Sequence, residues 1–311
     1  MITTMKTQVK DGFRAVVAFL AVAAPALAES GLAATGAMVA PKAPAEVKLR
    51  VLPGKNMAFA TATLEGRECN LLFDTGATHT TFDMGFVRRE LPDVKLENVV
   101  LCGVSNVEGA PKIFRAHSLK IGEAEFRELD AMALDISGLT PGIGVKVDGV
   151  LGMDVIGRVP ALVSFGAGKV VFAPGKEDCE GFGEGIARFR GDPLSVAMVP
   201  EIGGRKFGLI VDSAATFTFL DKSLGWPSTG EPVGIGAVDV NGKGAIKAEK
   251  GRTDKLKLGI DVEISPLLVA EPMNRIGADT LLAYDMLVDL GQVRFRKFKD
   301  AGLPRCVPEC K

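Results

Sequence analysis

The chain carries the same segment twice. Residues 66–83 read GRECNLLFDTGATHTTFD and residues 204–221 read GRKFGLIVDSAATFTFLD, so the two align without a gap at a spacing of 138 (212 − 74). Two further matches follow in the same order. LKIG at 119–122 matches LKLG at 256–259, and DGVLGMDVI at 148–156 matches ADTLLAYDML at 278–287 when Asp154 is aligned with Asp285. Several elements that recur in one order indicate a duplicated unit, so the chain is predicted to fold as two related halves.

Short apolar runs separated by turn residues predict an all-β fold for both halves. From residue 47 onward these runs alternate with Gly, Pro, Asn and Asp, which is the pattern of many short strands joined by turns. The 311 residues suffice for two cores. We expect a first lobe over 47–176, a linker over 177–192 and a second lobe over 193–298. Helical segments are expected at Asp83–Glu90, Met153–Gly157 and Ala283–Leu287.

The first 28 residues have the pattern of an export signal. Lys6, Lys10 and Arg14 precede a run of small and apolar residues over 15–28 that ends in Ala-Leu-Ala, as in a cleavable secretory signal. An uncleaved membrane anchor is the alternative, but the run is shorter than the roughly 20 residues that a span requires. We therefore expect a periplasmic or secreted protein without stable membrane insertion after cleavage. The Ala- and Pro-rich residues 29–46 are expected to form a flexible leader.

The five cysteines favour a disulfide over a metal site. Export permits disulfides, and Cys179 could form one with Cys306 or Cys310 in the tail at 299–311. Cys69 lies in an apolar run and is expected to be a buried free thiol. Cys306 and Cys310 could instead bind a metal, but a chain with only two histidines offers few partners. No metal site is therefore predicted, and the net charge of −1 gives no indication of binding to nucleic acid.

Each half contains a candidate hairpin between its first two matched elements. The first turns near Glu108 and Gly109, and the second turns at Asn241 and Gly242, a dipeptide that favours the tight turns of β-hairpins. Both hairpins have β-branched residues in their strands. They are predicted to be either mobile flaps over a binding cleft or ordinary surface hairpins.

An aspartate ends a buried apolar run at the same place in both halves. Leu-Leu-Phe precedes Asp74, and Leu-Ile-Val precedes Asp212. A carboxylate at the end of a buried strand is unfavourable unless it is hydrogen-bonded or paired, although a single aspartate often only caps a turn. Two copies at equivalent positions of a duplicated unit are more informative, because a two-fold axis between the halves would bring the carboxylates together.

These features resemble the clan of pepsin-like and retropepsin-like aspartic proteases, and most of all a bacterial, exported, single-chain form with two retropepsin-like lobes. The resemblance extends from about residue 58 to residue 295. It implies two homologous closed β lobes related by pseudo-two-fold symmetry, with a cleft between them that binds a polypeptide substrate. It also implies that Asp74 and Asp212 are the catalytic pair of an endopeptidase that requires no cofactor. Because one chain supplies both lobes, the protein is expected to be a monomer.

The resemblance gives supporting roles to the loop that follows each aspartate. These loop residues are Thr75, Gly76 and Ala77 in the first lobe and Ser213, Ala214 and Ala215 in the second. Thr75 and Ser213 would cross-brace the two loops. Leu151-Gly152 would brace the first aspartate loop, and Leu282-Ala283 would brace the second.

Four alanines depart from the pattern of the clan. Ala214 and Ala283 stand where the first lobe has Gly76 and Gly152, which leaves open a catalytically impaired protein that only binds peptides. A structural β protein of the cell envelope is a further alternative, but it does not explain the repeated aspartates. Ala77 and Ala215 replace a hydroxyl residue that hydrogen-bonds the carboxylate in pepsin-like members. The pKa values of the pair are therefore expected to be raised, with an optimum between mildly acidic and near-neutral pH.

Overall fold

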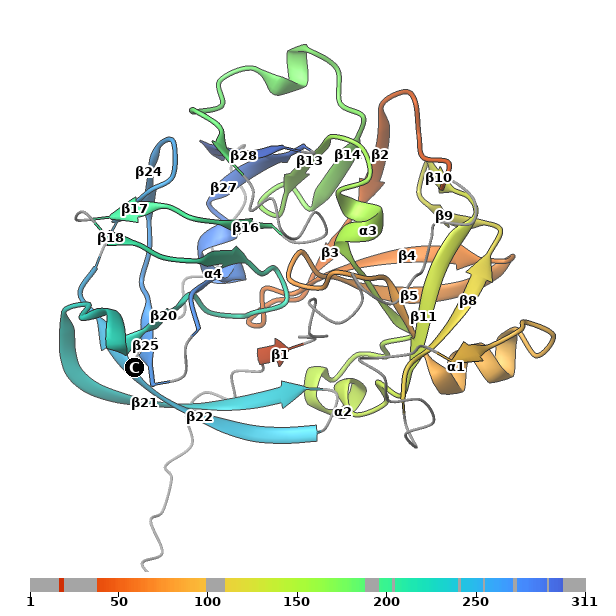
Figure 1. The fold of residues 1–311 in the computed structure, drawn as a ribbon, viewed down its shortest axis with the longest axis horizontal. Coiled ribbons are helices and arrows are strands. Elements are labelled where there is room, and N and C mark those ends of the chain that lie inside the picture. Colours follow the sequence, from red (N-terminus) through yellow and green to blue (C-terminus); the bar gives the residue numbers. More distant parts are fainter. Residues whose placement is uncertain are drawn as a thin grey trace, which may run out of the picture.

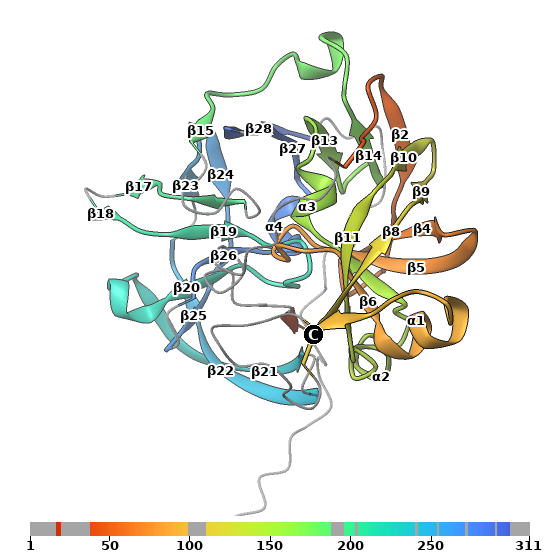
Figure 2. The same ribbon diagram turned by 45° about the vertical axis from the view of Figure 1, so that its right-hand side comes forward.

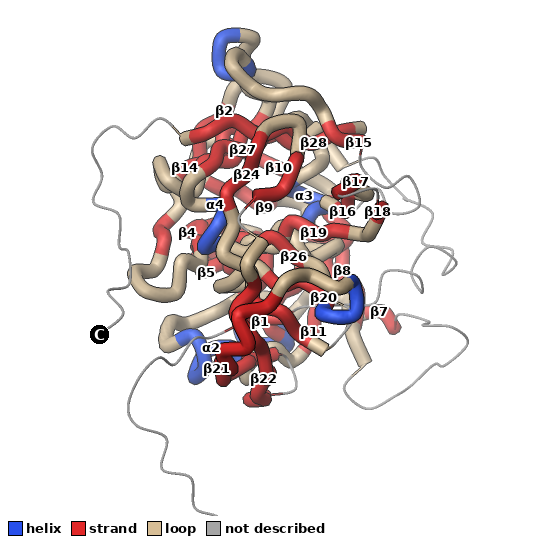
Figure 3. The backbone as a smooth tube through the Cα atoms, turned by 90° about the vertical axis from the view of Figure 1, so that its left-hand side faces the viewer, coloured by secondary structure: helices blue, strands red, loops and turns tan. Residues whose placement is uncertain are grey.

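A computed structural model of the chain describes residues 17–19, 38–98, 110–187, 196–202, 205–239, 242–253, 255–270, 273–289 and 291–298. Strands account for most of the regular secondary structure of these residues, and the helices among them are short (Figure 3). The all-β prediction is therefore confirmed. The helical segments are α1 (Met84–Glu90), α2 (Leu139–Ile143), α3 (Met153–Ile156), α4 (Ala278–Leu281) and the 3-10 turns η2 (Glu177–Cys179) and η3 (Lys222–Leu224).

In the described part of the chain, the first half forms a ten-stranded sheet in the order β10-β9-β4-β5-β12-β6-β11-β8-β7, with β3 paired to β4. Its strands are β3 (Arg50–Val51), β4 (Ala58–Leu64), β5 (Arg67–Phe73), β6 (Thr81–Asp83), β7 (Glu97–Asn98), β8 (Lys112–Ala116), β9 (Leu119–Ile121), β10 (Ala124–Phe126), β11 (Leu129–Leu134) and β12 (Gly149–Leu151).

The second half contributes all but one strand of an eight-stranded sheet in the order β1-β21-β22-β25-β20-β26-β19-β16. Its strands are β16 (Ala197–Met198), β19 (Leu209–Val211), β20 (Phe219–Asp221), β21 (Ser228–Asp239), β22 (Gly242–Gly251), β25 (Leu267–Val269), β26 (Arg275–Ile276) and, from the apolar run that predicts the export signal, β1 (Val17–Phe19). Two hairpins stand apart from it: β17 (Glu201–Ile202) with β18 (Arg205–Lys206), and β23 (Lys255–Lys257) with β24 (Asp261–Glu263).

A six-stranded sheet takes strands from both halves, in the order β15-β28-β27-β13-β14-β2. They are β2 (Ala45–Lys48), β13 (Ala161–Ser164), β14 (Lys169–Phe172), β15 (Ile186–Ala187), β27 (Tyr284–Val288) and β28 (Gln292–Lys297). The pairing of β13 with β27 runs from Ala161 opposite Val288 to Ser164 opposite Asp285. In Figure 1 this sheet lies across the top, with the ten-stranded sheet to the right and the eight-stranded sheet to the left.

The two larger sheets repeat one pairing scheme. Strand β5 lies parallel to β12, β12 lies antiparallel to β6, and β6 lies parallel to β11. The pairs β19–β26, β26–β20 and β20–β25 have the same three directions in the same order. The LKIG and LKLG matches also agree, because Gly122 (φ 55°) and Gly259 (φ 72°) each follow the first strand of an antiparallel pair. Glycine suits such turns since it adopts positive φ without a steric penalty.

A continuous apolar core runs beneath both halves. Its largest cluster includes Phe73 and Leu151 from the first half and Val211, Ile276 and Phe295 from the second, all of them buried. The strands that lead into the two aspartates are therefore anchored in one common core.

Two of the three predicted helices are confirmed. Helix α1 begins after Asp83, whose carboxylate accepts a hydrogen bond from the amide of Phe86 at 3.0 Å, as an N-cap does. Helix α3 lies within the predicted range 153–157. The prediction for Ala283–Leu287 is wrong, because these residues run into β27, which is buried along its whole length between β13 and β28. A short buried apolar run does not distinguish a strand from a helix by its period.

The hairpin predicted in the second half is present, and it is long. Strands β21 and β22 pair as far as Asp239 opposite Gly242. Both strands pass beside α2 of the first half, and Figures 1 and 2 show the hairpin sweeping under the molecule toward that helix. Glu108, Gly109 and Asn241 lie outside the described residues.

None of the helices in the described ranges combines the length and the apolar character that a membrane crossing would require.

Candidate active site

The two repeated aspartates lie at the ends of central strands. Asp74 follows β5 and Asp212 follows β19, and each residue is only 2% exposed. The amide of Asp74 donates to the carbonyl of Leu151 at 3.1 Å, and the amide of Asp212 donates to the carbonyl of Ile276 at 2.9 Å. The backbone of each aspartate is thus held by a hydrogen bond to a neighbouring parallel strand. This strand is β12 for Asp74 and β26 for Asp212.

Thr75 and Ser213 bind the two aspartate loops to each other. The amide of Thr75 donates to Oγ of Ser213 at 3.0 Å, and the amide of Ser213 donates to Oγ1 of Thr75 at 3.1 Å. Each hydroxyl then donates across the interface, from Thr75 to the carbonyl of Val211 and from Ser213 to the carbonyl of Phe73, both at 2.8 Å. Both side chains are fully buried. These bonds join segments 138 residues apart and hold the two loops in register.

The loop after Asp74 closes on its own carboxylate. Oδ1 of Asp74 accepts hydrogen bonds from the amides of Gly76 at 2.7 Å and Ala77 at 3.2 Å. Burial and the neighbouring charge of Asp212 raise the pKa of Asp74 well above its usual value, and they outweigh the lowering effects of these two amides and of the charge on Arg275. The two carboxylates are therefore close enough to interact strongly.

The carboxylate of Asp212 lies directly against the first loop. A Cβ built on Gly76 would fall 2.7 Å from Cγ of Asp212 and 2.9 Å from its Oδ1. On its own side, Oδ1 of Asp212 accepts from the amides of Ala214 at 3.1 Å and Ala215 at 2.9 Å. The structure thus brings both aspartates and both predicted loops together, and Gly76 leaves the space that the second carboxylate fills.

Ala214, which replaces the glycine of the first loop, is accommodated by apolar neighbours. It is fully buried in a cluster of first-half residues that includes Leu72, Ala77 and Val150. Its methyl group therefore adds to an apolar contact, where a methyl group on Gly76 would meet a carboxylate.

The predicted brace of the second loop is wrong. Leu282 and Ala283 follow α4 and do not contact the aspartate through their backbone; the carbonyl bonded to Asp212 belongs to Ile276. Gly277 then occupies the place that Gly152 has in the first half. A Cβ on Gly277 would lie 2.2 Å from the carbonyl oxygen of Phe217, and one on Gly152 would lie 2.5 Å from the carbonyl carbon of His79. The second half therefore keeps this glycine.

The alignment of Asp154 with Asp285 is wrong for the same reason. The amides of Met153 and Asp154 donate to the loop carbonyls of Ala77 and Thr78. In the second half, the corresponding donors are the amides of Ala278 and Asp279, which bind the carbonyls of Ala215 and Thr216. The true counterpart of Asp154 is thus Asp279, at a spacing of 125 (279 − 154).

Two buried carboxylates that sequence reasoning missed support the loops. Oδ1 of Asp154 accepts from the hydroxyl of Thr80 at 2.7 Å, and Oδ1 of Asp279 accepts from the hydroxyl of Thr218 at 2.9 Å. These hydroxyls in turn accept from the amides of the two glycines, 152 and 277, at 3.1 Å. Burial raises the pKa of Asp154 and raises that of Asp279 to about 6. The repeated signal is Gly-x-Asp, found at 152–154 and at 277–279.

Arg275 is the second functional candidate that the sequence prediction missed. Its side chain is 14% exposed, and its Nη1 donates to Oδ2 of Asp212 in a close ion pair. No signal within its own segment marks it, because its place beside Asp212 follows from the register of β26 against β19.

The cysteines lie away from this site. Cys69 is a buried free thiol, as predicted. Burial raises its pKa to about 12. Cys179 in η2 forms no disulfide with another described residue, and its predicted partners Cys306 and Cys310 lie outside the described residues. In the ranges that the structure describes, no three His, Cys, Asp or Glu side chains form a cluster that could hold a metal ion.

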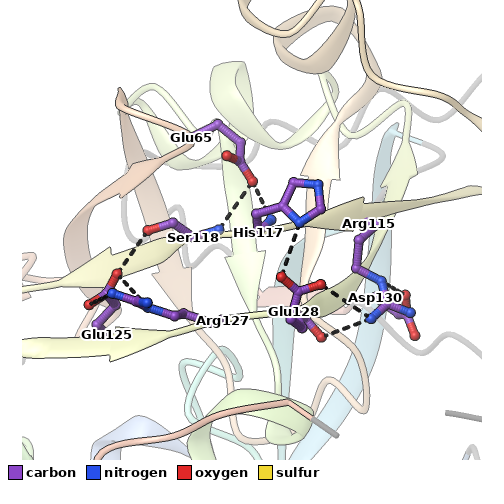
Figure 4. Close-up of polar contacts among 8 residues, drawn as sticks. All are labelled: Glu65, Arg115, His117, Ser118, Glu125, Arg127, Glu128 and Asp130. Atoms are coloured by element: carbon purple, nitrogen blue, oxygen red, sulfur yellow. Dashed lines mark hydrogen bonds and ion pairs between the residues drawn. The ribbon is translucent and has the colours of Figure 1, made fainter. Parts of the chain in front are cut away.

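A surface groove of about 860 Å³ lies on the ten-stranded sheet and does not include either aspartate. Its wall carries the ion pair between Arg115 and Asp130 at 2.7 Å and the contact of His117 with Glu128 at 3.1 Å (Figure 4). The carboxylate of Glu128 raises the pKa of His117. Since these charges are paired with each other, the groove is a weaker candidate for chemistry than the buried aspartates.

Comparison with known families agrees with the first half of this site. Residues 60–155 match a family model described as aspartyl protease. The matched segment contains Asp74, its loop and the Gly-x-Asp brace at 152–154, and it ends before Asp212. A comparison with curated proteins found no match. Over the segment that holds Asp74, the chain is therefore similar to aspartyl proteases.

Proposed function

We propose that this protein is an aspartic endopeptidase in which Asp74 and Asp212 act together on a water molecule to hydrolyse peptide bonds. The observation that carries the proposal is the reciprocal pair of hydrogen bonds between Thr75 and Ser213, which holds the two aspartate loops face to face. The match of residues 60–155 to aspartyl proteases supports it independently.

The proposed chemistry follows from the closeness of the carboxylates. Two buried carboxyl groups at such short range share one proton, because both cannot be ionised together. The ionised member takes a proton from water while the oxygen of that water bonds to the peptide carbon. The protonated member gives its proton to the carbonyl oxygen. When the tetrahedral intermediate collapses, the C–N bond breaks and the leaving amine takes the proton that the first carboxylate removed from water. One hydroxyl of the diol returns its proton to the carboxyl group that was protonated at the start.

In this proposal the hairpin of β21 and β22 covers the bound polypeptide. Ile235 on β21 and Ile246 on β22 pack in one apolar cluster with Ala215, beside Asp212. The far part of the hairpin passes α2, whose Leu139 and Ile143 belong to the apolar cluster around Ala77. Because the aspartates are buried, substrate entry requires this hairpin to move. An extended peptide would then bind between the hairpin and the aspartate loops.

The proposal also covers the division into two lobes, the monomeric state and the export of the protein. The repeated pairing scheme and loop bonds support two lobes related by pseudo-two-fold symmetry, each giving one aspartate. A single chain would then be active as a monomer. The pattern of residues 1–28 supports export to the periplasm or the medium, with removal of the signal.

The test is cleavage of an unfolded polypeptide by the purified mature protein, from about pH 3 to about pH 8. Asp74→Asn and Asp212→Asn are each expected to abolish cleavage, and pepstatin is expected to suppress it. Asp135→Asn, a surface carboxylate bonded to Ser137, is the matched control and should cleave normally. Folded protein that binds peptides without cleaving them at any pH would show the catalytically impaired alternative instead.

A further inference from the structure

Arg275 forms an ion pair with one of the two aspartates, Asp212, and its charge lowers the pKa of Asp74 by less than burial and Asp212 raise it. In the ladder of β19 and β26, Arg275 lies opposite Ile210, two residues before Asp212. In the ladder of β5 and β12, the residue opposite Leu72, two residues before Asp74, is Val150. The register therefore makes Arg275 the counterpart of Val150. One aspartate has a guanidinium at this position, and the other has an aliphatic side chain.

The two carboxylates are consequently held by different donors. Both oxygens of Asp212 are engaged, Oδ1 by the amides of Ala214 and Ala215 and Oδ2 by Arg275. The hydrogen bonds given to Asp74 in the described structure come from backbone amides and reach Oδ1. Val150 is fully buried among apolar side chains, Leu72 and Ala77 included. A charge-assisted bond favours the ionised carboxylate, whereas an apolar wall favours the neutral one.

Other charges near Asp212 do not oppose this difference. Asp279 on α4 is bonded to Thr218, and Asp221 on β20 caps η3 through the amide of Ser223. The described charged side chains of the hairpin are exposed or paired at the surface, as Lys247, the pair Glu249 with Lys222, and the pair Lys250 with Glu231. Among the side chains that the structure describes, the charged groups that face Asp212 from the adjoining elements are therefore Asp74 and Arg275.

We propose that Arg275 is a positioning residue that keeps the negative charge of the pair on Asp212 and so leaves the shared proton on Asp74. This inference rests on the proposed function. Asp212 is then the base that takes the proton from water, and Asp74 is the acid that protonates the carbonyl oxygen. Arg275 also supplies to one carboxylate the donor that Ala77 and Ala215 cannot provide. The pair has fixed roles before substrate binds.

The first test is the pH dependence of kcat/KM for Arg275→Val, which installs the residue found in the first half. Without the guanidinium, the acidic limb of the profile is expected to move to higher pH by about one unit or more. Arg275→Lys keeps a charge and should shift the limb less. Arg115→Val removes a half-buried ion pair with Asp130 and should leave the limb unchanged. An Arg275→Val profile that superimposes on that of the natural protein would overturn the proposal.

The second test uses stability and needs no catalysis. Asp212→Asn makes the guanidinium face a neutral amide, whereas Asp74→Asn keeps the neutral form that the structure favours. The denaturation midpoint should therefore fall more for Asp212→Asn than for Asp74→Asn, and the difference should vanish in the Arg275→Val background. If Asp212→Asn alone does not fold, the two asparagine variants can still be compared in the Arg275→Val background. Equal losses, or a difference that persists without Arg275, would overturn the proposal even if the protein proves to have no protease activity.

Discussion

Gly76 and Asp212 share one space at the junction of the two halves. A side chain on Gly76 would have to begin 2.7 Å from the carboxyl carbon of Asp212, a distance that two such carbons cannot adopt. Gly76→Ala is therefore expected to displace the second aspartate and to lower kcat/KM by about 100-fold or more, since misplacements near 1 Å have effects of that size.

A substitution at the equivalent position of the second loop, Ala214, should have only a mild effect on stability and activity. Ala214→Gly removes one methyl group from an apolar cluster, at a cost in stability of roughly 1–2 kcal/mol from lost burial and added backbone freedom, and should leave the aspartates in place. Kinetics and urea denaturation of the two variants check both statements. A larger kinetic loss for Ala214→Gly than for Gly76→Ala would contradict this account of the junction.

The bonds between Thr75 and Ser213 predict a coupled loss of stability. Ser213→Ala leaves the amide of Thr75 and the carbonyl of Phe73 buried without their partner, which costs about 1–3 kcal/mol for each such group. Thr75→Val should behave alike, and the double variant should lose less than the sum, because both changes break one network. Thr229→Val, at an exposed hydroxyl bonded to the carbonyl of Lys250, is the control. Additive losses in urea denaturation would disprove the network.

The corrected brace predicts which glycine matters in the second half. Gly277→Ala brings a methyl group within about 2 Å of the carbonyl of Phe217, so it should unfold the loop or abolish cleavage. Ala283→Gly, at the position that the sequence alignment singled out, should retain activity within a few-fold because Ala283 lies beyond α4. Thermal denaturation and cleavage assays of the two proteins separate these outcomes. If Gly277→Ala stayed active and Ala283→Gly lost activity, the original alignment of Ala283 with Gly152 would be correct after all.

Asp279 makes stability depend on pH. Its pKa is raised to about 6 in the folded protein from 3.8, so its contribution to stability is complete below about pH 4 and is lost as the pH rises through about 6. Asp279→Asn keeps an acceptor for Thr218 and removes the buried charge. It should stabilise the protein at pH 8, by up to about 3 kcal/mol, and have little effect at pH 4. Urea denaturation at both pH values measures this, and an equal effect at both would contradict the assignment.

The raised pKa of Asp74 predicts the shape of the activity profile. Burial and the charge of Asp212 keep Asp74 protonated well above the usual range of an aspartic acid. Activity should therefore persist toward neutral pH and fall on the alkaline side as Asp74 loses its proton. Initial rates across the pH range test this, and an optimum below about pH 3 would be incompatible with it.

The sequence predicted this site where the repeat is free of gaps. The aspartates and the loops that follow them lie at one constant spacing of 138 (212 − 74), so each half predicts the other. The third match failed because the second half is shorter between its elements, which changes the spacing from 138 to 125. Asp285 then offered a plausible but wrong partner for Asp154, and a helix was predicted where β27 forms.

Arg275 could not be recognised from the same information. Its role depends on the register of β26 against β19, and register is a property of paired strands rather than of one segment. Once Ile276-Gly277-Ala278-Asp279 is aligned with Leu151-Gly152-Met153-Asp154, Arg275 is aligned with Val150. The hydrogen bonds of the backbone were needed to find that alignment.

The six-stranded sheet has a consequence for the order in which the protein is assembled. Strand β13 ends at residue 164, but its partner β27 begins at residue 284. Because synthesis proceeds from the N-terminus, β13 lacks this partner strand until residues 284–288 have been synthesised. A chain interrupted before residue 284 can carry both aspartates yet has no strand to close that edge. Synthesis of residues 284–288 is thus a precondition for the sheet that the two halves share, and the pairing of β13 with β27 cannot form before that segment exists.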